Sequence, residues 1–176
     1  MMQSLRSPRV WMSAFLALGL FASVYLLVVY VTGGPIACGP THGCDVVRAS
    51  RWAYIGPIPQ PLLGVLFYAG MLGLLVTRSV LQTPARTQLW LQRLTLLGAI
   101  VGMAESVVLF LIQWLEIGAF CAWCLVSGAA ATGTFVLAWL DRASLTDGQR
   151  EADLQGYALV LGMLALVGTP LLLVLL

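Results

Sequence analysis

Five long apolar segments constrain the fold of this chain more than any other feature. They run roughly over residues 11–31, 59–81, 89–114, 120–140 and 154–176. Each has about 20 residues or more, which is enough to cross the ~30 Å hydrocarbon core of a bilayer as a helix. Because lipid cannot satisfy the polar edge of an open strand, a helix is the expected form of every segment. The sequence therefore predicts an all-α integral membrane protein.

The composition agrees with this class and excludes others. Hydrophobic residues make up 60% of the 176 residues and charged residues only 9%, whereas a soluble domain has about 25% charged residues. The nine basic residues are dispersed arginines, so the chain lacks the clustered basic charge that binds nucleic acid. The first apolar segment is longer than the core of a secretory signal and no small-residue cleavage site follows it. A cleaved signal peptide is therefore not expected.

The arginines are distributed unevenly between the two ends of the segments. One side carries seven of them, and the other side carries only Arg48 and Arg51. Because positively charged loops stay in the cytoplasm, the arginine-rich side is predicted to be cytoplasmic in an inner, or plasma, membrane. The loop over residues 32–58 and the start of the fourth segment would then face the periplasm or the exterior. The seven arginines are Arg6, Arg9, Arg78, Arg86, Arg93, Arg142 and Arg150.

The loop over residues 32–58 is long for so small a membrane protein, and loops of this length are usually functional. Its front half is rich in glycine and proline. Its back half, residues 45–54, combines apolar and basic positions in a pattern that predicts a short helix lying on the membrane surface. Asp45 is the predicted cap of this helix.

Two cysteines form a CxxC sequence, Cys121-Ala122-Trp123-Cys124, at the start of the fourth segment. Residues three apart share one face of a helix. In a first turn, unpaired N–H groups and the positive end of the helix dipole stabilise a thiolate and lower its pKa. This pattern indicates a redox-active pair. The alternative is a pair of buried apolar thiols or a static disulfide.

The other two cysteines, Cys38 and Cys44, lie six residues apart in the outward loop. Alone, such a pair is typical of a structural disulfide, because the outer compartment is oxidising. Together with Cys121 and Cys124 on the same side of the membrane, it indicates a dithiol relay based on direct thiol–disulfide exchange. A zinc site is the competing chemistry, but this spacing is not that of a usual zinc finger, and no metal is expected.

This arrangement of four cysteines resembles the vitamin K epoxide reductase family, over roughly residues 11–140. The resemblance includes Asp45-Val46-Val47 and Ser50-Arg51-Trp52 after the second loop cysteine, and the sequence LGVLFY at 63–68. It implies a prokaryotic-type member without a fused thioredoxin-like domain. The implied architecture is a four-helix bundle around a quinone pocket in a catalytic domain, residues 1–140, followed by a connector and a fifth transmembrane helix, residues 141–176.

The resemblance also implies a role for each cysteine. Cys38 would exchange with a separate reduced partner, a thioredoxin-like protein of the DsbA type on the outer side. Cys44 would then attack Cys121, and Cys124 would face and reduce the quinone. The implied electron acceptor is menaquinone, ubiquinone or phylloquinone, and a quinone epoxide is a possible acceptor too.

Three further site residues are implied by the resemblance. Gln60 stands where some members place a hydrogen-bonding residue for the quinone carbonyl. Ser50 matches a serine near the active site, and Trp52 a tryptophan that packs beside it. The chain departs from vertebrate members at Gly128, where those members have a tyrosine whose hydroxyl contacts the quinone and anticoagulant inhibitors.

Two ionisable residues remain open to more than one interpretation. Glu105, in the outer half of the third segment, would either supply protons to the quinone or form a hydrogen bond to a neighbouring helix as a neutral carboxyl. His42 would either stabilise a thiolate at Cys44 or be a solvated loop residue.

The sequence thus predicts a membrane thiol:quinone oxidoreductase that supports disulfide formation. The alternative is a non-catalytic membrane scaffold or transporter subunit with two structural disulfides.

Overall fold

The computed structural model describes residues 8–38, 43–80 and 84–142. Their long helices are α1 (Pro8–Thr32), α3 (Gln60–Val80), α4 (Ala85–Ile112) and α5 (Ala122–Arg142). Each of the four, with α4 extended to Ile117, is long and apolar enough to cross a membrane, which confirms four of the five predicted spans. The fifth predicted span, 154–176, and His42, Arg6 and Arg150 lie outside the described residues.

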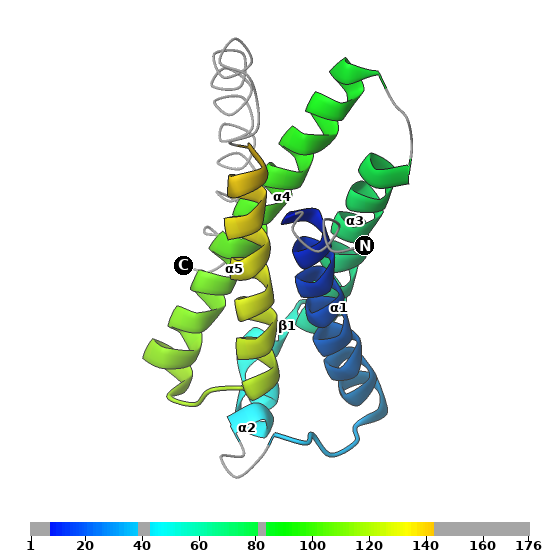
Figure 1. The fold of residues 1–176 in the computed structure, drawn as a ribbon. Helices are drawn as coiled ribbons and strands as arrows, with labels where there is room; N and C mark the ends of the chain where they lie inside the picture. The colour runs from blue at the N-terminus through cyan, green and yellow to red at the C-terminus, as the bar shows by residue number, and fades with distance from the viewer. Residues whose placement is uncertain (1–7, 39–42, 81–83, 143–176) are drawn as a thin grey trace. The chain divides into compact units, whose positions relative to one another are not determined.

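The four long helices alternate in direction, so that chain neighbours are antiparallel (Figure 1). The loop between α1 and α3 and the turn between α4 and α5 lie at the same end of these helices. α3 packs against both α1 and α4. Gly98 and Gly102, the GxxxG of α4, face the side chains of Met71 and Phe67 of α3, where an added Cβ would collide with them. Small residues therefore allow these helices to approach closely, as membrane bundles require.

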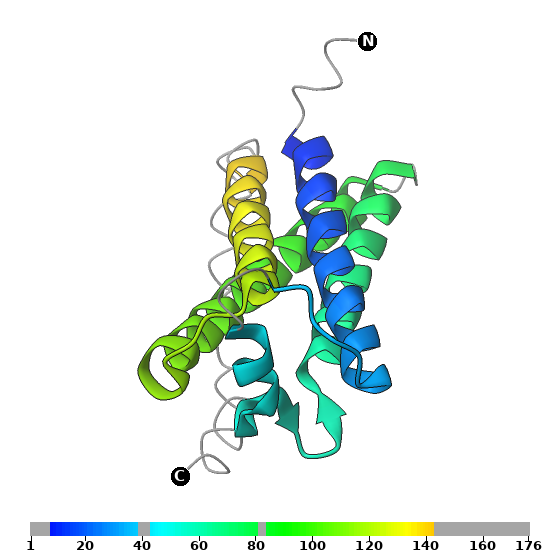
Figure 2. The same ribbon diagram turned by 90° about the horizontal axis from the view of Figure 1, so that it is seen from below.

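The loop between α1 and α3 contains two helical pieces and a hairpin, seen from below in Figure 2. α2 (Gly43–Ala49) is followed by a 3₁₀ turn, η3 (Arg51–Ala53), and then by the strands β1 (Tyr54–Ile55) and β2 (Ile58–Pro59). A short helix is present where the sequence predicts one, but it spans Gly43–Ala49 instead of residues 45–54. Asp45 therefore stands in its first turn instead of capping it, where its charge still suits the helix dipole.

The hairpin β1–β2 was not expected from the sequence. Its strands pair in antiparallel register, and Gly56 turns the chain between them with a φ of 60°. A left-handed residue of this kind is needed in a tight turn, and glycine adopts it without a steric penalty. Strands are predicted from alternating apolar and polar residues, and strands of two residues are too short to show this pattern in the sequence.

The end of the helices opposite the cysteines is joined by a buried ion pair. Nη2 of Arg78 on α3 donates to Oδ2 of Asp141 on α5 at 2.8 Å, and both side chains are buried. Gln92 of α4 donates to the backbone carbonyl of Asp141 at 2.9 Å. Nε of Arg9 on α1 lies 3.5 Å from Oδ1 of the same carboxylate. This far-end cluster (Arg9, Arg78, Gln92 and Asp141) therefore connects all four long helices.

Candidate functional site

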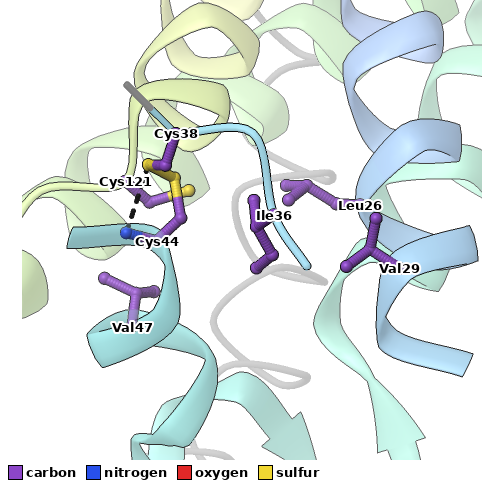
Figure 3. Packing of buried hydrophobic residues seen from close by; sticks show 7 residues of the cluster. All are labelled: Leu26, Val29, Ile36, Cys38, Cys44, Val47 and Cys121. Atoms are coloured by element: carbon purple, nitrogen blue, oxygen red, sulfur yellow. Dashed lines mark hydrogen bonds between the residues drawn. A yellow bond between two sulfur atoms is a disulfide. The ribbon is translucent and has the colours of Figure 1, made fainter. Parts of the chain in front are cut away.

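The two cysteine pairs meet at the loop end of the helices. Cys38 and Cys44 form a disulfide with a Cα–Cα distance of 5.8 Å, and Cys121 and Cys124 are free thiols. Cys121 lies beside the disulfide in one buried cluster (Figure 3). Cys124 packs against that cluster. Because Cys44 and Cys121 are only 1% and 2% exposed, sulfur exchange between them would take place away from bulk water. The cluster also contains Leu26, Val29, Ile36 and Val47.

Cys121 stands directly before the first residue of α5, as the cap of that helix. Its Sγ accepts a hydrogen bond from the backbone N–H of Cys124 at 3.3 Å, and its carbonyl accepts from Leu125 at 3.0 Å. The first N–H groups of a helix have no partner within the helix, and a side chain just before it can accept from the N–H of its third residue, here Cys124. Hydrogen bonds from the Cys124 thiol, and from the backbone N–H groups of Cys124 and Trp123, lower the pKa of Cys121, which precedes the membrane span. This position therefore favours a thiolate.

The backbone around Cys44 touches the backbone around Cys121. A Cβ on Gly43 would collide with the carbonyl oxygen of Phe120, so only glycine permits this contact. The side chain of Gln113, in the π-helical turn η4 (Gln113–Ile117), is buried, and its Oε1 accepts from the N–H of Cys121 at 2.8 Å. These contacts fix the start of α5 next to α2.

A second set of contacts holds the loop that carries Cys38. The N–H of Ala37 donates to the hydroxyl of Tyr25 on α1, and Nε1 of Trp123 donates to the carbonyl of Ala37, both at 2.9 Å. The rings of Tyr25 and Trp123 lie 4.5 Å apart between centroids. This Ala37 clamp (Tyr25, Ala37 and Trp123) attaches the loop to α1 and α5. Sequence reasoning missed it, and the only available signal was a tryptophan inside the CxxC.

A cavity of about 310 Å³ opens beside Cys124. Its wall includes Gln60, Trp52 and Glu105, and Gly128 where the family departure was noted. Cavities of this size are at the small end of ligand sites, large enough for a one- or two-ring head group. Much of the remaining wall is apolar or aromatic, including Leu26, Tyr30, Phe67, Tyr68, Leu109 and Phe110.

Of the three residues predicted to contact the quinone, Gln60, Trp52 and Ser50, only Ser50 does not line this cavity. Its hydroxyl donates to the carbonyl of Val47 at 2.6 Å. It lines a separate shallow pocket together with Arg51, Trp52 and Glu116. A hydroxyl occupied in this way supports the end of α2, and a direct contact to a ligand in the cavity is not available to it.

Trp52 is held at the cavity by a carboxylate from α4's extension. Its Nε1 donates to Oε2 of Glu116 at 2.7 Å, and Arg51 forms an ion pair with the same oxygen at 2.9 Å. η3 is thereby attached to η4 across the loop end of the helices.

Two polar pairs face the cavity. Nε2 of Gln60 donates to Oε1 of Glu105 at 2.9 Å, so Glu105 does form the expected hydrogen bond to a neighbouring helix. The hydroxyl of Tyr68 bonds the carbonyl of Ser127 at 2.7 Å and lies 2.9 Å from the Ser127 hydroxyl. Because Tyr68 is engaged by Ser127 and position 128 is glycine, the Gln60–Glu105 pair is the more available polar group for a ligand.

The model of the vitamin K epoxide reductase family matches residues 10–139, well over half of the chain. The match includes the four long helices almost completely, both cysteine pairs and the residues that line the cavity.

Proposed function

Because the chain belongs to the vitamin K epoxide reductase family of membrane thiol–quinone oxidoreductases, we propose that it oxidises a separate thioredoxin-like protein and reduces a membrane quinone. The placement of Cys44 and Cys121 in one buried cluster, with Cys124 on the cavity wall, is the observation that carries this proposal. Thiol–disulfide exchange requires sulfur atoms to meet directly, and this arrangement supports such a meeting.

The electrons move in three exchanges: from the partner to the loop pair, from the loop pair to the CxxC, and from the CxxC to the quinone. The partner's dithiol reduces the Cys38–Cys44 disulfide and itself becomes a disulfide. Cys44 then attacks Cys121 of an oxidised Cys121–Cys124 pair, and Cys124 leaves as a thiolate. Cys38 attacks Cys44 in turn, which restores the loop disulfide and releases Cys121.

The last exchange regenerates the oxidant. The Cys121–Cys124 dithiol passes two electrons and two protons to the quinone, which becomes a hydroquinone, and the sulfur–sulfur bond re-forms. The oxidised loop pair and the free CxxC thiols correspond to the stage just before this step.

The quinone ring would occupy the cavity against Cys124, with Gln60 as its hydrogen-bonding partner and Trp52 beside it. Menaquinone, ubiquinone and phylloquinone share a para-quinone ring, which in menaquinone and phylloquinone is fused to a benzene ring, and a quinone epoxide carries one further oxygen on the para-quinone ring. The long tail would leave the cavity toward lipid, since 310 Å³ holds little more than the head group.

The protein would lie in the inner, or plasma, membrane with its cysteine end facing the periplasm or the exterior. Arg9, Arg78, Arg86, Arg93 and Arg142 lie toward the opposite end of the helices, which supports a cytoplasmic position for that end. An oxidising outer compartment is where a disulfide-forming enzyme is needed.

The test uses purified protein, a reduced thioredoxin-like protein and a short-tailed ubiquinone, with quinone absorbance as the readout. We expect one quinone to be reduced for each partner disulfide formed. Cys124→Ser should abolish quinone reduction. Cys38→Ser should abolish oxidation of the partner, but it should still reduce quinone when dithiothreitol replaces the partner as the reductant of the CxxC. Two disulfides that resist mild reductant, with no quinone turnover, would contradict the proposal and favour a scaffold.

A further inference from the structure

Glu105 is the one carboxyl group among the residues that line the cavity. It belongs to α4, within a membrane-spanning segment, where an ionisable side chain is costly unless it has a partner or a function. Its partner is Gln60, the first residue of α3, with 2.9 Å between Nε2 of Gln60 and Oε1 of Glu105.

The observed hydrogen bond leaves the other end of the amide unsatisfied. Oε1 of Gln60 is buried and has no donor within the described structure. A buried acceptor without a donor costs about 1–3 kcal/mol. A donor is therefore missing at this point of the cavity wall, and a ligand hydroxyl would supply one.

The amide can satisfy both of its ends in two ways that differ by one proton on Glu105. With an ionised Glu105, the NH₂ group of Gln60 donates to the carboxylate and Oε1 accepts from a ligand. With a protonated Glu105 and the amide turned by 180°, Oε1 accepts from the carboxyl O–H and the NH₂ group donates to a ligand. The first arrangement suits a hydroquinone, whose hydroxyl is a donor, and the second suits a quinone, whose oxygen only accepts.

We propose that Glu105 delivers a proton to the quinone oxygen that faces Gln60, and that the Gln60 amide turns from donor to acceptor as the ring is reduced. This inference rests on the proposed function. Glu105 lines the cavity itself, so its proton passes to the ring directly or through one water, as general acids do.

The step balances with the groups already named. Two electrons leave the Cys121–Cys124 dithiol as its sulfur–sulfur bond forms, and both enter the ring. One ring oxygen takes the proton of Glu105, and the other takes the proton of one thiol. The proton of the second thiol restores the Glu105 carboxyl, so the net reaction remains dithiol plus quinone giving disulfide plus hydroquinone.

The experiment is a single turnover in which protein with a reduced Cys121–Cys124 pair is mixed with a short-tailed ubiquinone. Glu105→Gln keeps the size and the hydrogen bond to Gln60 but removes the proton, and it should slow quinone reduction about 100-fold. Glu105→Asp should restore part of the rate. Asp45→Asn, which changes an exposed carboxyl on α2 away from the cavity, is the matched control and should reduce quinone like the wild type.

Two further readouts separate a proton role from a structural one. Dithiol exchange with a reduced thioredoxin-like protein, measured without quinone, should be unchanged in Glu105→Gln. The infrared difference spectrum between quinone and hydroquinone states should contain a carboxyl band that is absent in Glu105→Gln and shifted in Gln60→Ala. An unchanged quinone-reduction rate in Glu105→Gln, or equal slowing of both exchanges, would overturn this inference alone. A wild-type protein that never reduces quinone would overturn the proposed function and this inference with it.

Discussion

At the scale of single residues, the first cysteine of the CxxC, Cys121, is the cap of a helix. Cys121 precedes α5, so its sulfur accepts the hydrogen bond that a serine or aspartate would usually accept at that place. The pair was placed at a helix start from its sequence alone, because an apolar run begins there. The buried neighbours that shield it, such as Val29 and Val47, come from other parts of the chain and could not be predicted.

The lowered pKa of Cys121 can be tested by titration. In a Cys38→Ser, Cys44→Ser, Cys124→Ser variant, the serine at 124 still offers a hydroxyl donor and the backbone N–H groups remain. Because the folded-state pKa is lowered, the thiolate should persist as the pH falls below the ordinary thiol value of about 8.5. The ultraviolet absorbance of the thiolate against pH measures this, with the same variant unfolded in denaturant as the control. A midpoint at or above that of the unfolded protein would contradict the prediction.

The burial of Cys44 and Cys121 in one cluster predicts which sulfurs form a disulfide between the two cysteine pairs. A Cys38→Ser, Cys124→Ser variant leaves Cys44 and Cys121, which share the buried cluster, and it should form the Cys44–Cys121 bond in mild oxidant. The matched control, Cys44→Ser with Cys121→Ser, leaves the two outer cysteines and should remain largely as free thiols. Peptide mapping by mass spectrometry without reduction measures both. Equal yields in the two variants would show that the exchange order is wrong.

At the scale of elements, the sequence predicted the helices better than the contacts between them. Apolar length sufficed for α1, α3, α4 and α5, and the pattern of apolar and basic positions sufficed for α2. The Ala37 clamp and the hairpin β1–β2 depend on backbone groups, whose partners are set by tertiary packing and leave no pattern in the sequence. The π-helical turn η4, which brings Gln113 to Cys121, could not be predicted from the sequence for the same reason.

The contact between α2 and the start of α5 should not tolerate a side chain at Gly43. In Gly43→Ala the added Cβ meets the carbonyl oxygen of Phe120, which belongs to backbone and cannot move away alone. We expect α2 to shift and electron transfer from the loop pair to the CxxC to slow at least tenfold. A tenfold slowing corresponds to an activation barrier that is higher by about 1.4 kcal/mol. Stopped-flow mixing with a reduced thioredoxin-like protein measures the rate.

The control for that variant is Gly70→Ala on α3, where an added Cβ meets nothing within 4 Å. Alanine is a better helix former than glycine, so this change should leave the exchange rate unaltered and stabilise the helix slightly. Equal exchange rates in Gly43→Ala and the wild type would show that the contact between α2 and Phe120 is not needed for the relay.

At the scale of the whole molecule, the cysteine pairs lie at the end of the bundle that carries α2, and the far-end cluster lies at the opposite end, where α3 and α5 end (Figure 1). Composition was enough to predict a membrane bundle, and arginine placement was enough to predict that both cysteine pairs lie at the same end of it. They did not predict the far-end cluster, because Asp141 and Arg78 are 63 positions apart in the chain. Only the folding of α3 and α5 into one bundle brings these two charges together.

In the far-end cluster, removing one partner of the Arg78–Asp141 ion pair should lower stability much more than replacing both partners with apolar residues. Asp141→Ala would leave the buried guanidinium of Arg78 without its carboxylate, and such a change costs about 3–5 kcal/mol. Two nitrogens of Arg78, Nε and Nη1, are already buried without a partner in the described structure, so the pair is imperfectly compensated. Asp141→Leu combined with Arg78→Met should therefore regain most of the loss. Thermal unfolding midpoints in one detergent measure all variants.

Arg9→Gln is the matched control, since Arg9 is 43% exposed and 3.5 Å from the same carboxylate, where an ion pair is worth about 0–1 kcal/mol. Its unfolding midpoint should stay close to that of the wild type. Below its own unfolding transition, Asp141→Ala should still reduce quinone at the wild-type rate, because the cysteines and the cavity lie at the other end of the helices. An Asp141→Ala midpoint no lower than that of Arg9→Gln would mean that the helices are held together without this cluster. Lost quinone reduction in a folded Asp141→Ala protein would instead mean that the two ends of the bundle are coupled.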